Sequence, residues 1–154
     1  MQYWVNIHHP SEINEDRSIQ CRVFVQKRSK RRPSVGDRAF IYETEALSGR
    51  TVVLKDEKGR HLVRLGKGAK AVIALVEITS GLKKHPHIWN GTQYVGSFDT
   101  KEIRTKEKKV KLSEINDRYL SMGIFKSFNP RMYTGLRVLK TNEIKTLSRL
   151  MGVR

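Results

Sequence analysis

Residues 85–96 (HPHIWNGTQYVG) concentrate side chains that could bind a flat ligand. Trp89 and Tyr94 lie in this segment, and its glycines let a ligand approach the backbone closely. We interpret the segment as a loop between two strands, so Trp89 has little core to fill and is predicted to be a ligand wall. Stacking of a nucleic-acid base on such a ring contributes about 1–3 kcal/mol. Trp4 and Phe24 lie in predicted strands, where a core role is the default.

Positive charge is the second feature with chemical consequences. The chain has 31 Lys and Arg against 15 Asp and Glu, a net charge of +16 that attracts polyanions. Five cations lie in residues 27–32 (KRSKRR) and six in residues 101–111 (KEIRTKEKKVK). Cations contact phosphates without reading the base sequence. The predicted contacts to a nucleic-acid backbone are Lys27, Arg28, Lys30, Arg31, Arg32, Lys101, Arg104 and Lys106.

Nucleic acid is thus the first candidate partner, and an anionic membrane surface is the second. No apolar run reaches the roughly 18 residues that a membrane span needs, so we expect no membrane insertion. Cys21 is the single cysteine, which excludes an intrachain disulfide and favours a cytoplasmic location.

The sequence patterns that would indicate catalysis or metal binding are weaker than those that indicate nucleic-acid binding. His8-His9, His85 and His87 do not have the spacing of a helical zinc motif, and no paired CxxC is present. The carboxylates stand mostly beside cations and form no isolated acid pair for general acid–base catalysis. We therefore expect no metal, no cofactor and no catalytic residue.

The elements that position these residues can be predicted from hydrophobic alternation. The length of 154 residues predicts one domain, residues 1–154. Extended segments are predicted at residues 2–7, 21–26, 38–44, 51–65 as a hairpin, 69–80, 98–105 and 136–139. Helices are predicted at residues 12–20, from Ser113, and from Thr141 to a stop at Gly152. We expect an α+β fold, a curled sheet or pseudo-barrel of about six strands with two or three short helices.

The order of several motifs carries a resemblance that extends over nearly the whole chain. An opening strand with Tyr3-Trp4 precedes a basic segment that ends in residues 35–42 (VGDRAFIY), and residues 71–78 follow with Glu77 near their end. Residues 109–115 (KVKLSEI) and 134–139 (TGLRVL) then precede a short last helix. In this order the chain resembles the EVE domain of the PUA-like superfamily.

The resemblance implies a PUA-like fold and a base flipped into an aromatic pocket. EVE domains are related to YTH domains, which hold a methylated adenine in an aromatic cage with one wall from a Trp-x-Gly segment; Trp89-Asn90-Gly91 occupies a similar place. The chain departs from the family before the VGD turn, where Phe24 is the only aromatic residue. The pocket walls that the resemblance implies are Trp89, Tyr94, Phe24 and Tyr42.

Our main hypothesis is a non-catalytic module that recognises a modified, methylated base in DNA or RNA, with its oligomeric state left open. One alternative is an enzyme: relatives in the ASCH group are implied to hydrolyse RNA or small amides. A Lys–Glu pair meeting in the pocket, drawn from Glu77, Glu43 and Lys101, would favour it. The other alternative is an RNA-binding protein without preference for a modified base.

Overall fold

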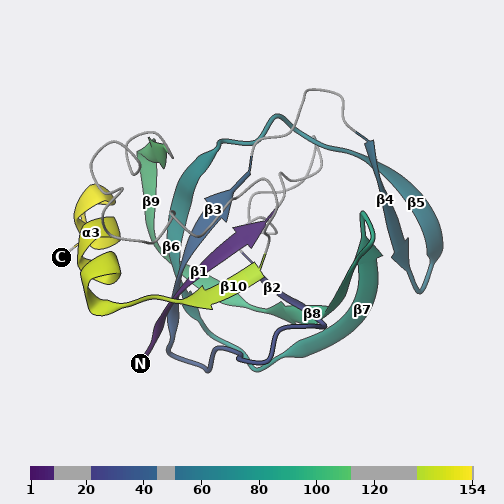
Figure 1. Cartoon of the computed structure of the whole chain (residues 1–154), viewed down its shortest axis with the longest axis horizontal. Helices are drawn as coiled ribbons and strands as arrows, with labels where there is room; N and C mark the ends of the chain where they lie inside the picture. The colour runs from purple at the N-terminus through teal and green to yellow at the C-terminus, as the bar shows by residue number, and fades with distance from the viewer. Residues whose placement is uncertain (9–21, 45–50, 112–134, 154) are drawn as a thin grey trace.

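Two five-stranded sheets make up most of the molecule (Figure 1). This computed structural model describes residues 1–8, 22–44, 51–111 and 135–153. The first sheet has the order β10-β1-β3-β6-β9 and the second the order β2-β8-β7-β4-β5. The strands are β1 (Tyr3–His8), β2 (Val23–Gln26), β3 (Arg38–Glu43), β4 (Thr51–Asp56), β5 (Gly59–Arg64), β6 (Ala71–Ile78), β7 (Lys83–Trp89), β8 (Thr92–Phe98), β9 (Thr100–Lys111) and β10 (Gly135–Val138), followed by helix α3 (Thr141–Leu150).

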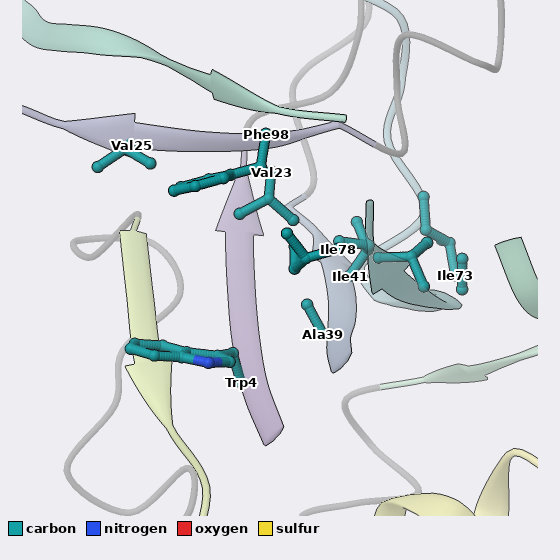
Figure 2. Packing of buried hydrophobic residues seen from close by; sticks show 10 residues of the cluster. Trp4, Val23, Val25, Ala39, Ile41, Ile73, Ile78 and Phe98 are labelled. Atoms are coloured by element: carbon teal, nitrogen blue, oxygen red, sulfur yellow. The ribbon is translucent and has the colours of Figure 1, made fainter. Parts of the chain in front are cut away.

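The strands β1, β3 and β6 of the first sheet are buried on both faces, because each of them alternates between two apolar clusters. One cluster lies between the sheet and α3 and includes Val5 and Phe40 of the sheet and Leu147 of the helix. The other lies between the two sheets, where Trp4 and Ile41 are grouped with residues of β2 and β8 (Figure 2). The predicted core role of Trp4 is confirmed, since its side chain is 1% exposed.

The chain is a β-rich α+β fold, as the sequence predicts at this coarse level. The predicted strands over residues 2–7, 38–44 and 69–80 and the hairpin over 51–65 are confirmed, as is the last helix. The prediction of about six strands is too low, since ten strands lie among the described residues. The predicted helices at residues 12–20 and from Ser113, together with Cys21, fall outside the described residues.

Two of the additional strands come from residues 85–96, which the sequence analysis interprets as a loop. That interpretation is wrong: the segment belongs to β7 and β8, which pair antiparallel around Asn90 and Gly91. Both turn residues have positive φ, 48° and 83°. An Asn-Gly pair adopts this left-handed geometry easily, and the resulting two-residue turn matches the twist of paired strands.

A buried carboxylate holds the start of β1 against the turn before β3. Asp37 accepts hydrogen bonds from the Gln2 amide at 2.9 Å and from Trp4 Nε1 and the Ser34 amide at 3.0 Å each. Burial raises the pKa of Asp37, but the three hydrogen bonds outweigh burial and hold the pKa below its ordinary value of 3.8. The carboxylate is therefore charged at neutral pH and satisfies the indole N–H of a core tryptophan.

We expect Asp37→Ala to lower the free energy of unfolding at neutral pH by about 1–3 kcal/mol, because the Trp4 indole N–H would be buried without an acceptor. Urea denaturation measures the change. Asp99→Ala is the control: Asp99 pairs with Lys83 near the surface, where an ion pair contributes about 0–1 kcal/mol.

The difference in stability between the wild type and Asp37→Ala should also depend on pH. A carboxyl whose pKa is depressed by folding stabilises the fold above its unfolded pKa and loses that contribution as the pH falls through the folded pKa. The stability gap between the wild type and Asp37→Ala should therefore shrink below pH 3.8. A gap that stays constant through this range would contradict the role given to the charge.

A second prediction concerns the close approach of β7 and β8 at Gly96. A Cβ atom at this position would overlap the carbonyl oxygen of Lys83 on the neighbouring strand. We expect Gly96→Ala to cost about 1–3 kcal/mol through forced backbone shifts. Gly81→Ala, where a Cβ meets nothing within 4 Å, is the matched control, and equal melting temperatures for the two variants would count against this account.

Candidate functional site

Four aromatic rings from three adjacent strands meet on the second sheet; we call Phe24, His85, His87 and Tyr94 the aromatic cluster. The planes of His85 and His87 lie 13° apart with centroids at 5.3 Å, and those of His87 and Tyr94 lie 5° apart at 5.1 Å. Phe24 meets all three rings edge-on, at 6.0 to 6.4 Å. Parallel and edge-to-face contacts at these separations are both favourable for aromatic pairs.

Strand period and register bring these rings together. His85 and His87 are two residues apart on β7 and their rings stack on one face, and His87 lies opposite Tyr94 of β8. Tyr94 also lies opposite Gln26 at the end of β2. Phe24 alternates with Val23 and Val25, which are buried between the sheets, so its ring lies on the face turned away from the first sheet.

The cluster is unevenly exposed. Tyr94 is only 8% exposed, whereas Phe24, His85 and His87 are half-buried. Any flat ligand on this face would therefore meet the phenylalanine and the two imidazoles first, with Tyr94 as their support. Of the four pocket residues that the resemblance implies, two, Phe24 and Tyr94, are brought together here.

Hydrogen bonds fix the two imidazoles. His85 Nε2 lies 2.7 Å from Ser97 Oγ, and His87 Nδ1 lies 2.8 Å from the His85 carbonyl oxygen. A carbonyl can only accept, so His87 Nδ1 carries a proton and its Nε2 has a lone pair in the neutral ring. Burial, followed by the charges of His87 and Arg22, lowers the pKa of His85.

The Ser97–His85 contact has the residue types of a nucleophile and its base. Ser97 is 1% exposed, so its hydroxyl lies behind the imidazole rather than at the surface. Among the described residues no carboxylate hydrogen-bonds to His85 to orient it as a base. The contact therefore holds the ring in place, and the chemistry open to this face is stacking and proton exchange.

The first basic segment, residues 27–32, begins next to the aromatic cluster. The Lys27 amide donates to the Gln93 carbonyl at 2.9 Å, directly before Tyr94, and the Ser29 amide donates to the Gln26 carbonyl at 3.0 Å. Arg28 Nε donates to Gln26 Oε1 at 2.8 Å. All five cations of the segment, Lys27, Arg28, Lys30, Arg31 and Arg32, are exposed. The backbone thus fixes an exposed row of positive charge to the strands that present the rings.

The second basic segment lies elsewhere. Lys101 and Arg104 are exposed on β9, an edge strand of the first sheet, whereas the cluster belongs to the second sheet (Figure 1). Lys106 also lies on β9, but its side chain is beyond those that the structure describes. The two predicted groups of phosphate contacts are therefore on different sheets.

Glu77, Glu43 and Lys101, the residues considered for the enzyme alternative, make structural contacts in the first sheet. Glu77 lies across from Lys101 on one side and from Arg38 on the other. Glu43 is buried and accepts the Ala69 amide at 2.8 Å. Opposite charges on neighbouring strands stabilise a sheet, which accounts for the Glu77 pairings without a reaction.

Trp89 and Tyr42 do not join the aromatic cluster by ring contact. Trp89 ends β7 and packs with Leu54 against a small apolar cluster of Val52, Val63 and Leu65. The expectation that Trp89 has little core to fill is therefore wrong, while its role as a ligand wall stays a prediction. Tyr42 is fully buried in the cluster beneath α3, on the other face of the first sheet from Ile41.

The sequence analysis missed His85 and His87, which it treated as loop residues. The signal that could have found them is the Asn90-Gly91 turn, which predicts a hairpin. A strand ending at Trp89 places residues 85, 87 and 89 on one face, with the two histidines adjacent.

Two further findings bear on the expected partners. Within residues 1–8, 22–44, 51–111 and 135–153, no group of three or more His, Cys, Asp or Glu side chains is arranged to hold a metal ion. In the same part of the chain, no helix is long and apolar enough to span a membrane.

Comparisons with known proteins complete the description. No protein-family model matches the chain, and no curated protein matches it. Among solved structures, protein Atu2648 from Agrobacterium tumefaciens is similar, with 12% identity, a match covering 99% of this chain and 94% of that chain, and a TM-score of 0.49. A likeness of this extent assigns no function, so the site is interpreted from its own geometry.

Proposed function

We propose that this protein is a nucleic-acid-binding module of the EVE, PUA-like type. It holds the phosphate backbone with residues 27–32 and one extruded base against the aromatic cluster. The observation that carries the proposal is the attachment of an exposed cationic segment to Gln93, the residue before Tyr94. The positive charges that would bind phosphates are thereby attached to β2 and β8, the strands that carry Phe24 and Tyr94.

The cationic segment suits a polyanion because all five of its charged side chains are exposed. Each phosphate that a cation neutralises releases condensed counterions, and the affinity then falls linearly with salt on a logarithmic scale, with a slope of about −0.9 per phosphate on duplex DNA. Five cations in six positions would give a steep salt dependence. This term provides affinity without sequence preference.

The rings would supply a stacking contact with a base, which the contacts between cations and phosphates do not provide. Extruding a base from a stack costs a few kcal/mol, and one stacking contact returns about 1–3 kcal/mol. Stacking alone therefore does not offset extrusion, and the backbone contacts must contribute the remainder. Phe24 and the two imidazoles are the half-buried surfaces on which a base could lie.

A preference for a methylated base is the finer part of the proposal and rests on the resemblance to EVE domains. A methyl group adds apolar area, and burying it contributes about 25 cal/mol per Å². Trp89, two residues beyond His87 on β7, is the further aromatic wall that the resemblance implies.

We expect Lys30→Glu/Arg31→Glu/Arg32→Glu to weaken binding to all oligonucleotides and to flatten its salt dependence, because the segment's phosphate contacts are lost. Fluorescence anisotropy over a range of salt concentrations measures both effects. The control, Lys55→Glu/Arg60→Glu/Arg64→Glu, changes the net charge equally on exposed positions of β4 and β5. If both variants lose affinity to the same extent, net charge rather than this segment is responsible.

We expect Phe24→Leu to lower affinity for an oligonucleotide by about 1–3 kcal/mol, because an apolar side chain remains but the ring surface is gone. A panel of methylated and unmethylated DNA and RNA oligonucleotides shows which discrimination is lost with it. Tyr3→Leu, which removes a ring packed toward α3, should leave affinity unchanged. Equal affinity of Phe24→Leu and wild type would argue against a base on the aromatic cluster.

A further inference from the structure

We propose that the stacked imidazoles of His85 and His87 form an anion site for a phosphodiester group and take up one proton on binding it. The affinity of the protein for nucleic acid then rises as the pH falls toward the acid side of neutrality. The inference rests on the proposed function only for the source of the anion, the nucleic-acid backbone. Neither histidine belongs to the set of residues that the sequence assigns to binding.

The atom that receives the proton follows from the hydrogen bonds. His87 Nδ1 already donates to the His85 carbonyl, and His85 Nε2 is occupied by Ser97 Oγ. No described residue is hydrogen-bonded to His87 Nε2. In the neutral ring this nitrogen has a lone pair, and on protonation it becomes a donor. His87 Nε2–H is therefore the group that would donate to a phosphate oxygen.

Among the described residues, no carboxylate is placed as a counter-ion for an imidazolium at this site. The strands of the second sheet carry a single carboxylate, Asp56 at the end of β4, and it is bonded to the Lys58 amide and to His61. Asp99, just after β8, is paired with Lys83. Neither of these carboxylates contacts His85 or His87, so a proton on the pair would have no negative partner among the described residues.

The other ionisable groups near the pair are positive or neutral. On the strands packed against it and beside their ends these are Arg22, Lys27, Arg28, Lys83, Lys84, Lys55 and Tyr94. Burial, followed by the charges of His87 and Arg22, lowers the pKa of His85. The His85 ring is therefore neutral at neutral pH, and an arriving phosphodiester provides the negative charge that the described residues around the pair lack.

The pair of imidazoles should take up only one proton when it binds a phosphodiester. No covalent bond forms or breaks: the phosphodiester keeps its single negative charge, and one imidazole takes a proton from the buffer. A second imidazolium with its ring centre 5.3 Å away would be repelled, so the pair accepts one proton rather than two. The change of log affinity with pH equals the number of protons taken up on binding, so uptake of one proton sets an upper limit of about tenfold in affinity per pH unit.

The test measures binding of a short fluorescein-labelled oligonucleotide between about pH 5.5 and pH 8 at constant ionic strength, the range in which imidazole titrates. The wild type should bind more tightly at the acid end, and His85→Gln/His87→Gln should lose most of this dependence. His61→Gln is the control, because His61 is an exposed histidine bonded to Asp56 on β4. A double variant that keeps the wild-type pH dependence would overturn the proposal.

Nuclear magnetic resonance titration of the histidine ring protons in the wild type makes the test independent of the variants' folding. At a given pH the oligonucleotide should raise the protonated fraction of the His85–His87 pair and leave the ring signals of His61 unchanged. An equal rise with inorganic phosphate alone would overturn the nucleic-acid backbone as the source of the anion. Binding whose affinity does not change with pH overturns this inference alone, whereas no binding at low salt at any pH overturns the proposed function.

Discussion

The register in which β7 pairs with β8, including its shift between Lys84 and His87, is the constraint on which the candidate site depends. The register places His87 beside Tyr94 and lets Gly96 pass close to the Lys83 carbonyl. A slip by one residue would turn both histidines to the opposite face. The Asn90-Gly91 turn and the missing Cβ at Gly96 each oppose such a slip, because the first sets the start of the pairing and the second permits the close approach further along it.

Charge and packing are divided between the two sheets. The strands β1, β3 and β6 of the first sheet are covered on both faces and contain the larger part of the core, in which Asp37 accepts a hydrogen bond from Trp4. The second sheet uses one face for that core and leaves the other for the aromatic cluster. Because residues 27–32 follow β2 directly, the most cationic segment leaves the sheet from the strand that carries Phe24. Five of the 31 Lys and Arg residues of the chain thus lie directly after the strand that carries Phe24.

Several strands could be predicted from the sequence because their apolar residues have clear periods: β6 is a continuous apolar run, and β1 and β3 are rich in β-formers between turn residues. The hairpin of β7 and β8 is not predicted from hydrophobic alternation, because His85, Pro86 and His87 interrupt the apolar pattern. The Asn90-Gly91 pair nevertheless marks its turn. Tyr94 is singled out by its aromatic type within residues 85–96, whereas Phe24 enters the predicted site only through the resemblance, because its strand position favours a core role; the binding role of both stays a prediction. The closeness of His85 and His87 follows from the hairpin that Asn90-Gly91 predicts, but their contacts with Tyr94 and Phe24 depend on a register that only pairing reveals.

His87 and Phe24 each contact all three other members of the aromatic cluster, and Phe24 meets every one of them edge-on. Its edge-on contacts make the four positions energetically interdependent, so substitutions among them should not be additive. A change of ring size at Phe24 alters the support of both imidazoles at once, whereas a change at His85 leaves the other contacts in place. Replacement of one ring would therefore change the packing of the others, and Phe24 and His87 are the positions whose replacement affects every partner.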